Sequence, residues 1–156
     1  QDSLDTGQWQ LLGTDLSSKV LVQARRGLYR MERLEQMPPD YLKRFCRRGV
    51  GEYDGMLMID SALRAQVQFA QHNLLQPLAD QDGFDVIFLR NVLIYFDQPT
   101  KQRVLDNIVR ALRPGGWLIT GHCDSLHGVR LPLTQLSPSI YRCLGQTQPV
   151  RMRQPA

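Results

Sequence analysis

The most regular hydrophobic pattern lies in the second half of the chain. Residues 84–89 form an almost continuous apolar run of aromatic and β-branched side chains, which predicts a strand buried on both faces of a parallel sheet. Over residues 99–112 apolar positions recur at helical spacing, and Asp97 is placed to cap that helix. Proline and glycine at residues 113–116 end the helix, and residues 117–120 begin a second strand. The pattern predicts one βαβ unit.

Shorter patterns extend this arrangement in both directions. Residues 9–15 predict a short buried strand, and the helix expected after it runs through Val20, Leu21 and Ala24. Residues 67–69 predict another strand. Near the end of the chain, leucines with polar spacers occur over residues 121–136 and residues 139–144 alternate as a strand should, so we expect a closing antiparallel hairpin.

The segment over residues 28–60 does not follow the βαβ rhythm. Residues 38–48 predict a short basic helix that opens on two prolines, and glycines punctuate residues 50–59 like a hairpin. The residues alone thus predict a short helix followed by a hairpin-like segment. A solvated basic surface without a partner is the alternative interpretation of its charges.

Polar residues follow three of the predicted strands. Asp15, Asn73 and the pair Arg90-Asn91 each come at a strand end, and open parallel sheets bind ligands outside the carboxyl ends of their strands. We expect these residues to converge on one crevice. Asp15 has two interpretations: a carboxylate that accepts hydrogen bonds from ribose hydroxyls, or a helix cap.

Tyr95 follows the same strand end as Asn91. In a short helix the two residues would lie one turn apart, so both side chains would face the same crevice. The alternative is a core tyrosine whose hydroxyl is satisfied locally.

Length and composition indicate one main domain. The chain has 156 residues, of which 42% are hydrophobic, and no run has the roughly 18 apolar residues that a membrane span needs. We expect a soluble protein without a signal peptide or membrane insertion. Cys46, Cys123 and Cys143 are odd in number and lack metal-ligand spacing, so we expect reduced thiols in a cytoplasmic protein and no metal site.

The charge of the chain is concentrated in one segment. The formal net charge is +4, and residues 19–48 hold nine Lys or Arg against three Asp or Glu. This basic segment favours an acidic protein partner, and we expect no nucleic acid.

Several of these segments also carry a family resemblance. The stretch FDVIFLRNVLIYFDQPTKQRVLDNIVRALRPGG, followed by GHCDS, is similar to the carboxy-terminal half of the chemotaxis receptor methyltransferases, the CheR family. GTDLSSKVLVQARRGLY, YLKRFCRRG and VQFAQHNLL resemble the same family upstream. The resemblance covers roughly residues 9 to 145, and RNVLIYF after the central strand is its most specific part.

The resemblance implies a fold and an activity. The fold is α/β, a Rossmann-like class I methyltransferase sheet flanked by helices, with the small antiparallel β subdomain at residues 28–60. The implied enzyme transfers a methyl group from S-adenosylmethionine to glutamate side chains in the cytoplasmic helices of chemoreceptors. S-adenosylhomocysteine is the product, and no metal takes part. In the family the inserted subdomain contacts the receptor.

The resemblance also assigns roles to individual residues. Asp15 is the ribose-binding acid, and Asn73 and Leu74 belong to the adenine site. Arg90 and Asn91 complete the cofactor-binding set, and Tyr95 lies beside the sulfonium methyl as the catalytic candidate.

The resemblance further implies that parts of the enzyme are missing. Family members carry a glycine-rich turn after the first strand, preceded by an arginine-bearing helical domain, and neither is present here. We therefore expect the partial catalytic domain to span residues 9–145 and to be inactive alone. Residues 1–8 and 146–156 are expected to be disordered. Cys123-Asp124 stands where many members have Ser-Glu, which leaves the role of that loop open.

Three classes of function remain after this reading. The first is the receptor glutamate methyltransferase. The second is another enzyme of the same architecture, either a methyltransferase of unknown substrate or a nicotinamide dehydrogenase. The sequence contains no Gly-x-Gly-x-x-Gly motif, which argues against the dehydrogenase interpretation. The third is a methyltransferase-like module that only binds a partner.

Overall fold

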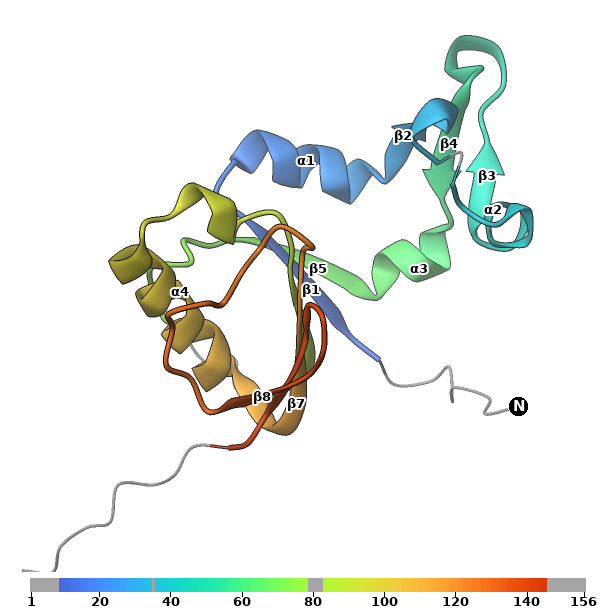
Figure 1. Cartoon of the computed structure of the whole chain (residues 1–156). Coiled ribbons are helices and arrows are strands. Elements are labelled where there is room, and N and C mark those ends of the chain that lie inside the picture. The colour runs from blue at the N-terminus through green and yellow to red at the C-terminus, as the bar shows by residue number, and fades with distance from the viewer. Residues whose placement is uncertain (1–8, 35, 79–82, 146–156) are drawn as a thin grey trace, which may run out of the picture. The chain divides into compact units, whose positions relative to one another are not determined.

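The computed structural model describes residues 9–34, 36–78 and 83–145, which form two compact units (Figure 1). The first unit ends at Asn73 and the second begins at Leu74. The two predicted disordered ends, residues 1–8 and 146–156, lie outside the described residues. None of the helices in the described part of the chain has the length and apolarity of a membrane span.

The first unit combines a parallel strand pair with a small antiparallel sheet. Its elements are β1 (Leu11–Asp15), α1 (Ser18–Arg26), β2 (Leu28–Arg30), the 3-10 helix η1 (Met31–Leu34), α2 (Pro39–Phe45), β3 (Cys46–Arg48), the 3-10 helix η2 (Gly51–Tyr53), β4 (Met56–Ile59), α3 (Ser61–Ala65) and β5 (Val67–Gln71).

The strand β1 pairs with β5 in parallel, from Leu11 opposite Val67 to Asp15 opposite Gln71. The helix α1 begins after its N-cap, Ser17, and ends at Arg26, followed by the C-cap Gly27, whose positive φ of 61° suits glycine. Arg25 near the end of α1 donates a hydrogen bond of 2.7 Å to the carbonyl of Phe69 and so ties the helix to β5. The predicted strand and helix are confirmed, although β1 is less buried than expected: Leu11 is 47% exposed.

The predicted antiparallel insertion is also present, in the strand order β2-β4-β3. Its detail differs from the prediction, because the helix α2 ends at Phe45 and residues Cys46–Arg48 form the strand β3 instead of a last helical turn. Pairing with β4 decides the conformation of these three residues: Cys46 lies opposite Ile59 and Arg48 opposite Leu57. Helix propensity is a weak preference that such tertiary pairing overrides.

The second unit is a four-stranded sheet with one long helix. Its elements are β6 (Phe84–Leu89), the 3-10 helix η3 (Leu93–Tyr95), α4 (Gln98–Ala111), β7 (Leu112–Thr120), β8 (Leu133–Ser137) and β9 (Ile140–Cys143), and its strand order is β6-β7-β9-β8. The strands β6 and β7 are parallel, and β9 and β8 follow as antiparallel neighbours. The predicted βαβ unit and closing hairpin are therefore confirmed.

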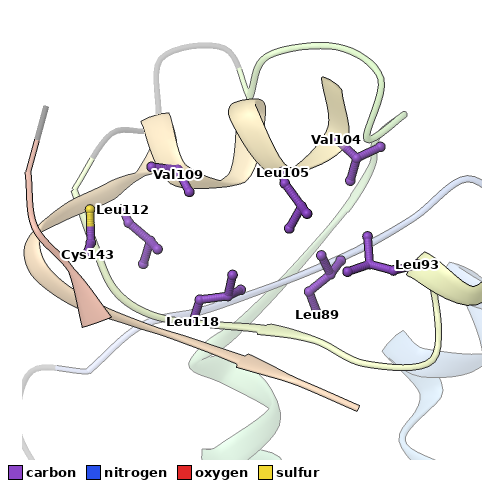
Figure 2. Close-up of a cluster of buried hydrophobic side chains, with 8 residues drawn as sticks. All are labelled: Leu89, Leu93, Val104, Leu105, Val109, Leu112, Leu118 and Cys143. Carbon is purple, nitrogen blue, oxygen red and sulfur yellow. The ribbon is translucent and has the colours of Figure 1, made fainter. Parts of the chain in front are cut away.

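The core of the second unit lies between α4 and one face of this sheet. Figure 2 shows side chains from the helix pointing toward Leu89 and Leu118 on the strands, with Leu93 beside them. The buried members of the cluster are Leu89, Leu93, Val104, Leu105, Val109, Leu112, Leu118 and Cys143. Asp97 caps α4 as predicted, since its Oδ1 accepts a hydrogen bond of 3.0 Å from the backbone N–H of Thr100.

The expectation that β6 is buried on both faces is wrong. Leu89 is buried, but Val86 is 40% exposed and Phe88 is 68% exposed. Alternate side chains of a strand point to opposite faces, and α4 covers only the face that carries Leu89.

The strand β7 begins at Leu112, five residues earlier than predicted, because Leu112 already pairs with Phe84. Two glycines that follow Leu112 in β7 occupy positions that a larger residue would not fit without strain. Gly115 has a φ of 78°, and a Cβ on Gly116 would lie 2.9 Å from the carbonyl oxygen of Phe84.

Candidate active site

The candidate site of the second unit lies where β6 and β7 end. The two strands are parallel neighbours, and Leu89 lies opposite Thr120. The residues that follow them, Arg90-Asn91 and Gly121, are therefore at the same edge of the sheet, where ligands of open α/β folds bind. Arg90 and Asn91 are both exposed.

A single buried carboxylate joins these two strand ends. Asp124 is 3% exposed, and four backbone N–H groups donate hydrogen bonds to its side chain. Oδ2 accepts from Asn91 at 2.5 Å and from Gly121 at 3.0 Å. Oδ1 accepts from Leu93 at 2.9 Å and from Ile94 at 3.3 Å. The residue thus satisfies the first N–H groups of η3, which have no carbonyl partner within that helix.

The two loops approach each other so closely that a side chain at Gly121 would not fit. A Cβ there would lie 2.7 Å from Oδ1 of Asn91 and 2.7 Å from Oδ2 of Asp124. Asn91 itself has a φ of 59°, a left-handed conformation that asparagine tolerates better than most residues. The backbone therefore turns sharply between β6 and η3.

This turn corrects one prediction about Tyr95. Asn91 and Tyr95 do not share a helical face, because η3 covers only Leu93–Tyr95 and Asn91 is left-handed. The tyrosine is 79% exposed, so it is not a core ring either. Its side chain is open to solvent in the loop that Asp124 holds.

Asp15 lies at the corresponding end of the parallel pair in the first unit. Its Oδ1 accepts a hydrogen bond of 2.7 Å from the N–H of Ser17, and Ser17 is the residue that caps α1. Asp15 is therefore not the N-cap itself. A carboxylate has two oxygens and about four acceptor positions, so this bond leaves capacity for hydroxyl donors.

Asn73 follows β5 at the same end of that sheet. The N–H of His72 donates to the carbonyl of Asp15 at 3.1 Å, which keeps the residues after the two strands together. Leu74 begins the second unit, and its carbonyl accepts a hydrogen bond of 3.0 Å from the amide of Asn107 on α4. The structure thus brings Asp15 and Asn73 to one sheet edge, and Arg90, Asn91 and Tyr95 to one loop. Convergence of these two groups on a single crevice stays a prediction.

Sequence reasoning missed Asp124 and Gly121 as organisers of this loop. Their only signal was the motif Gly-His-Cys-Asp after a predicted strand, and it does not reveal that the acid is buried. Among the residues that the structure describes, no group of three or more His, Cys, Asp or Glu side chains is arranged to hold a metal ion.

Comparison with known proteins gives consistent matches. The family model described as CheR methyltransferase, SAM binding domain, matches residues 2–141. The chain is 38% identical over 143 residues to the chemotaxis protein methyltransferase of Escherichia coli (strain K12), which covers 90% of this chain and 50% of that protein. It is 44% identical over 117 residues to chemotaxis protein methyltransferase 2 of Pseudomonas aeruginosa, with 74% of this chain and 42% of that protein covered.

The chain thus spans about half the length of the curated relatives it matches. Among solved structures, the N-methyltransferase NodS from Bradyrhizobium japonicum in complex with S-adenosyl-L-homocysteine is similar at 20% identity and a TM-score of 0.42. That match covers 71% of this chain and 40% of NodS.

Proposed function

Because the chain belongs to the CheR methyltransferase family, we propose that it is the carboxy-terminal part of an enzyme that methylates glutamate side chains of chemotaxis receptors. The methyl donor is S-adenosylmethionine. The observation that carries the proposal is the loop after β6, where Asp124 fixes the backbone of Asn91, Leu93 and Ile94 at the carboxyl ends of the parallel strands β6 and β7.

The donor and acceptor groups that are present fit the adenosine part of this cofactor. The Asp15 carboxylate keeps acceptor capacity for the ribose hydroxyls after its bond to Ser17. Asn73 and Leu74, just beyond β5, form the adenine side of the site. Arg90 and Asn91 are exposed beyond β6 and complete the cofactor-binding set.

The reaction requires alignment and no general base. When bound, S-adenosylmethionine supplies an electrophilic methyl group. A glutamate side chain, with an ordinary pKa of about 4.3, is already ionised at neutral pH and attacks without losing a proton. The protein therefore has to place the carboxylate in line with the methyl group, and positioning of this kind is worth about 7 to 11 kcal/mol in favourable cases. The exposed Tyr95 orients the reacting groups by donating a hydrogen bond from its hydroxyl.

The partner is a cytoplasmic helix of a chemoreceptor, so the enzyme acts in the cytoplasm. Attack by an ionised carboxylate on the methyl group needs no metal. The basic segment 19–48 supports the contact, since its nine Lys or Arg against three Asp or Glu exceed the net charge of +4 of the whole chain, and it runs into the antiparallel sheet. Arg47 already pairs with Asp60 at 3.1 Å and has a structural role. The exposed Arg44 and Arg48 are better candidates for contact with the receptor.

The proposal is tested with the full-length protein, receptor cytoplasmic domains and S-adenosylmethionine labelled on the methyl group. We expect label on the receptor that alkali releases as methanol, because esters of glutamate hydrolyse in base whereas methylated amines do not. A receptor whose methyl-accepting glutamates are replaced by alanine is the control. Alkali-stable label would indicate a different methyltransferase, and binding without transfer would indicate a non-catalytic module.

A further inference from the structure

We propose that Asp124 is a positioning residue of the methyl-transfer site: its carboxylate sets the shape of the loop that presents Asn91 and Tyr95. The proposal rests on the function proposed above. Asp124 does not contact the reacting groups itself. It acts through the backbone of residues 91–94, which it holds against Gly121.

The hydrogen bonds define what this residue does. Two donors, Leu93 and Ile94, open η3, and a third, Asn91, is the left-handed residue between the strand and that helix. The fourth, Gly121, belongs to the loop after the neighbouring strand. One side chain therefore fixes the turn after β6 and also its distance from the end of β7.

The second anchor of the loop is hydrophobic. Leu93 has no exposed surface and packs in the cluster beneath α4 (Figure 2). The backbone of η3 is thus held by Asp124 on its polar side and by Leu93 on its apolar side. Ile94 and Tyr95 are exposed, at 48% and 79%, and are free to face a ligand. A loop fixed at both anchors presents its outer side chains in one arrangement, which catalysis by alignment requires.

Only a carboxylate suits this set of partners. All four partners are N–H donors, and a carboxylate offers two acceptor oxygens with about four positions. Asparagine has nearly the same shape, but one of its two terminal groups is an NH₂ donor. In Asp124→Asn two of the four backbone N–H groups would face that donor, so the loop would have to rearrange.

The test compares Asp124→Asn with Asp97→Asn in the full-length protein. Asp97 is the matched control, because it is an aspartate of the same unit that accepts from one backbone N–H and is exposed. Three quantities are measured well below the melting temperature of each variant: amide hydrogen exchange, the Kd of S-adenosylhomocysteine by calorimetry, and kcat for receptor methylation.

In Asp124→Asn we expect faster exchange of the amides of Asn91, Leu93, Ile94 and Gly121, by tenfold or more. Kd should rise and kcat should fall by at least tenfold each, and Asp97→Asn should change neither. The effect on kcat should also be smaller when Asp124→Asn is introduced into a Tyr95→Phe protein, because the hydroxyl that the loop positions is then already absent.

Faster exchange at these four amides with Kd and kcat unchanged would overturn the proposal, because Asp124 would then support the fold alone. If the effects of Asp124→Asn and Tyr95→Phe on kcat were fully additive, the proposal that Asp124 acts through Tyr95 would be overturned. Failure of the proposed function is a separate result, namely a wild-type protein that binds S-adenosylhomocysteine but methylates no glutamate. The comparison of Kd values would still decide the role of Asp124 in that case.

Discussion

Leu93 and Tyr95 are two residues apart in η3 and have opposite environments. Leu93 has no exposed surface, whereas Tyr95 is 79% exposed. Substitution of the leucine would open a cavity in the core and change stability. The tyrosine ring contributes little buried surface, so a change confined to its hydroxyl isolates a functional effect.

We predict that Tyr95→Phe in the full-length protein lowers kcat by roughly tenfold to a hundredfold. This corresponds to about 1.4 to 2.8 kcal/mol lost from a hydrogen bond made mainly in the transition state. The melting temperature and the Kd of S-adenosylhomocysteine should change little. Tyr141→Phe is the control, since Tyr141 packs against the core of the same unit. An unchanged rate in Tyr95→Phe would remove the tyrosine from the mechanism.

Asp15 calls for a different pair of substitutions, because its Oδ1 also holds the N–H of Ser17. Asp15→Asn keeps an oxygen for that bond and loses the second acceptor, whereas Asp15→Ala loses both. We predict that both variants weaken cofactor binding by about 1 to 3 kcal/mol, the usual loss when a polar group is left unpaired. Asp15→Ala alone should also lower the melting temperature. If calorimetry finds the wild-type Kd in Asp15→Asn, the residue serves only the turn before α1.

At the scale of elements, regular periodicity was enough to predict β6, α4 and the closing hairpin. The helix α4 shows this best, because its apolar spacing, its cap Asp97 and its proline in the first turn all agree with one another. Prediction failed where a distant partner decides the local conformation. Cys46–Arg48 became a strand through pairing with β4, and the turn at Asn91 depends on a carboxylate 33 residues away. The family motif pointed to the loop after β6 as the candidate site, which stays a prediction, and it could not reveal how Asp124 holds that loop.

The cap of α4 gives a pH-dependent prediction. Hydrogen bonds from the side chain and then the backbone of Thr100 hold the pKa of Asp97 below its ordinary value of 3.8. A lowered pKa means that the stabilisation is fully present above the ordinary pKa and is lost as pH falls through the folded-state value. Asp97→Ala should therefore be less stable than the wild type at neutral pH, and the difference should shrink below about pH 4.

Thermal unfolding between pH 2 and pH 7 measures this difference. Asp97→Asn is the control, because asparagine caps helices comparably and does not titrate. Its melting temperature should stay near that of the wild type at neutral pH. A gap between wild type and Asp97→Ala that is constant across the whole range would show that the carboxylate charge does not stabilise the helix.

At the scale of the whole molecule, the candidate site residues are divided between the two units. The first unit ends at Asn73 and contains Asp15, the proposed acceptor for ribose. The second contains Leu74, Arg90, Asn91 and Tyr95. The 156 residues include no glycine-rich turn of the kind that holds the methionine part of the cofactor on backbone N–H groups. The proposed roles of the groups present thus cover adenosine recognition and the candidate catalytic loop.

Because these 156 residues lack that glycine-rich turn, we predict that the chain alone binds S-adenosylhomocysteine more weakly than the full-length protein does. Binding free energy comes from both ends of the ligand, and the contacts proposed for this sequence involve only its adenosine end. We expect adenosine to compete for the residual binding about as well as S-adenosylhomocysteine does, because both present the same ribose and adenine. Asp15→Asn should weaken that residual binding further. Calorimetry on chains shown to be folded by circular dichroism measures the affinity for S-adenosylhomocysteine, the competition by adenosine and the effect of Asp15→Asn. An affinity for S-adenosylhomocysteine equal to that of the full-length protein would contradict the prediction.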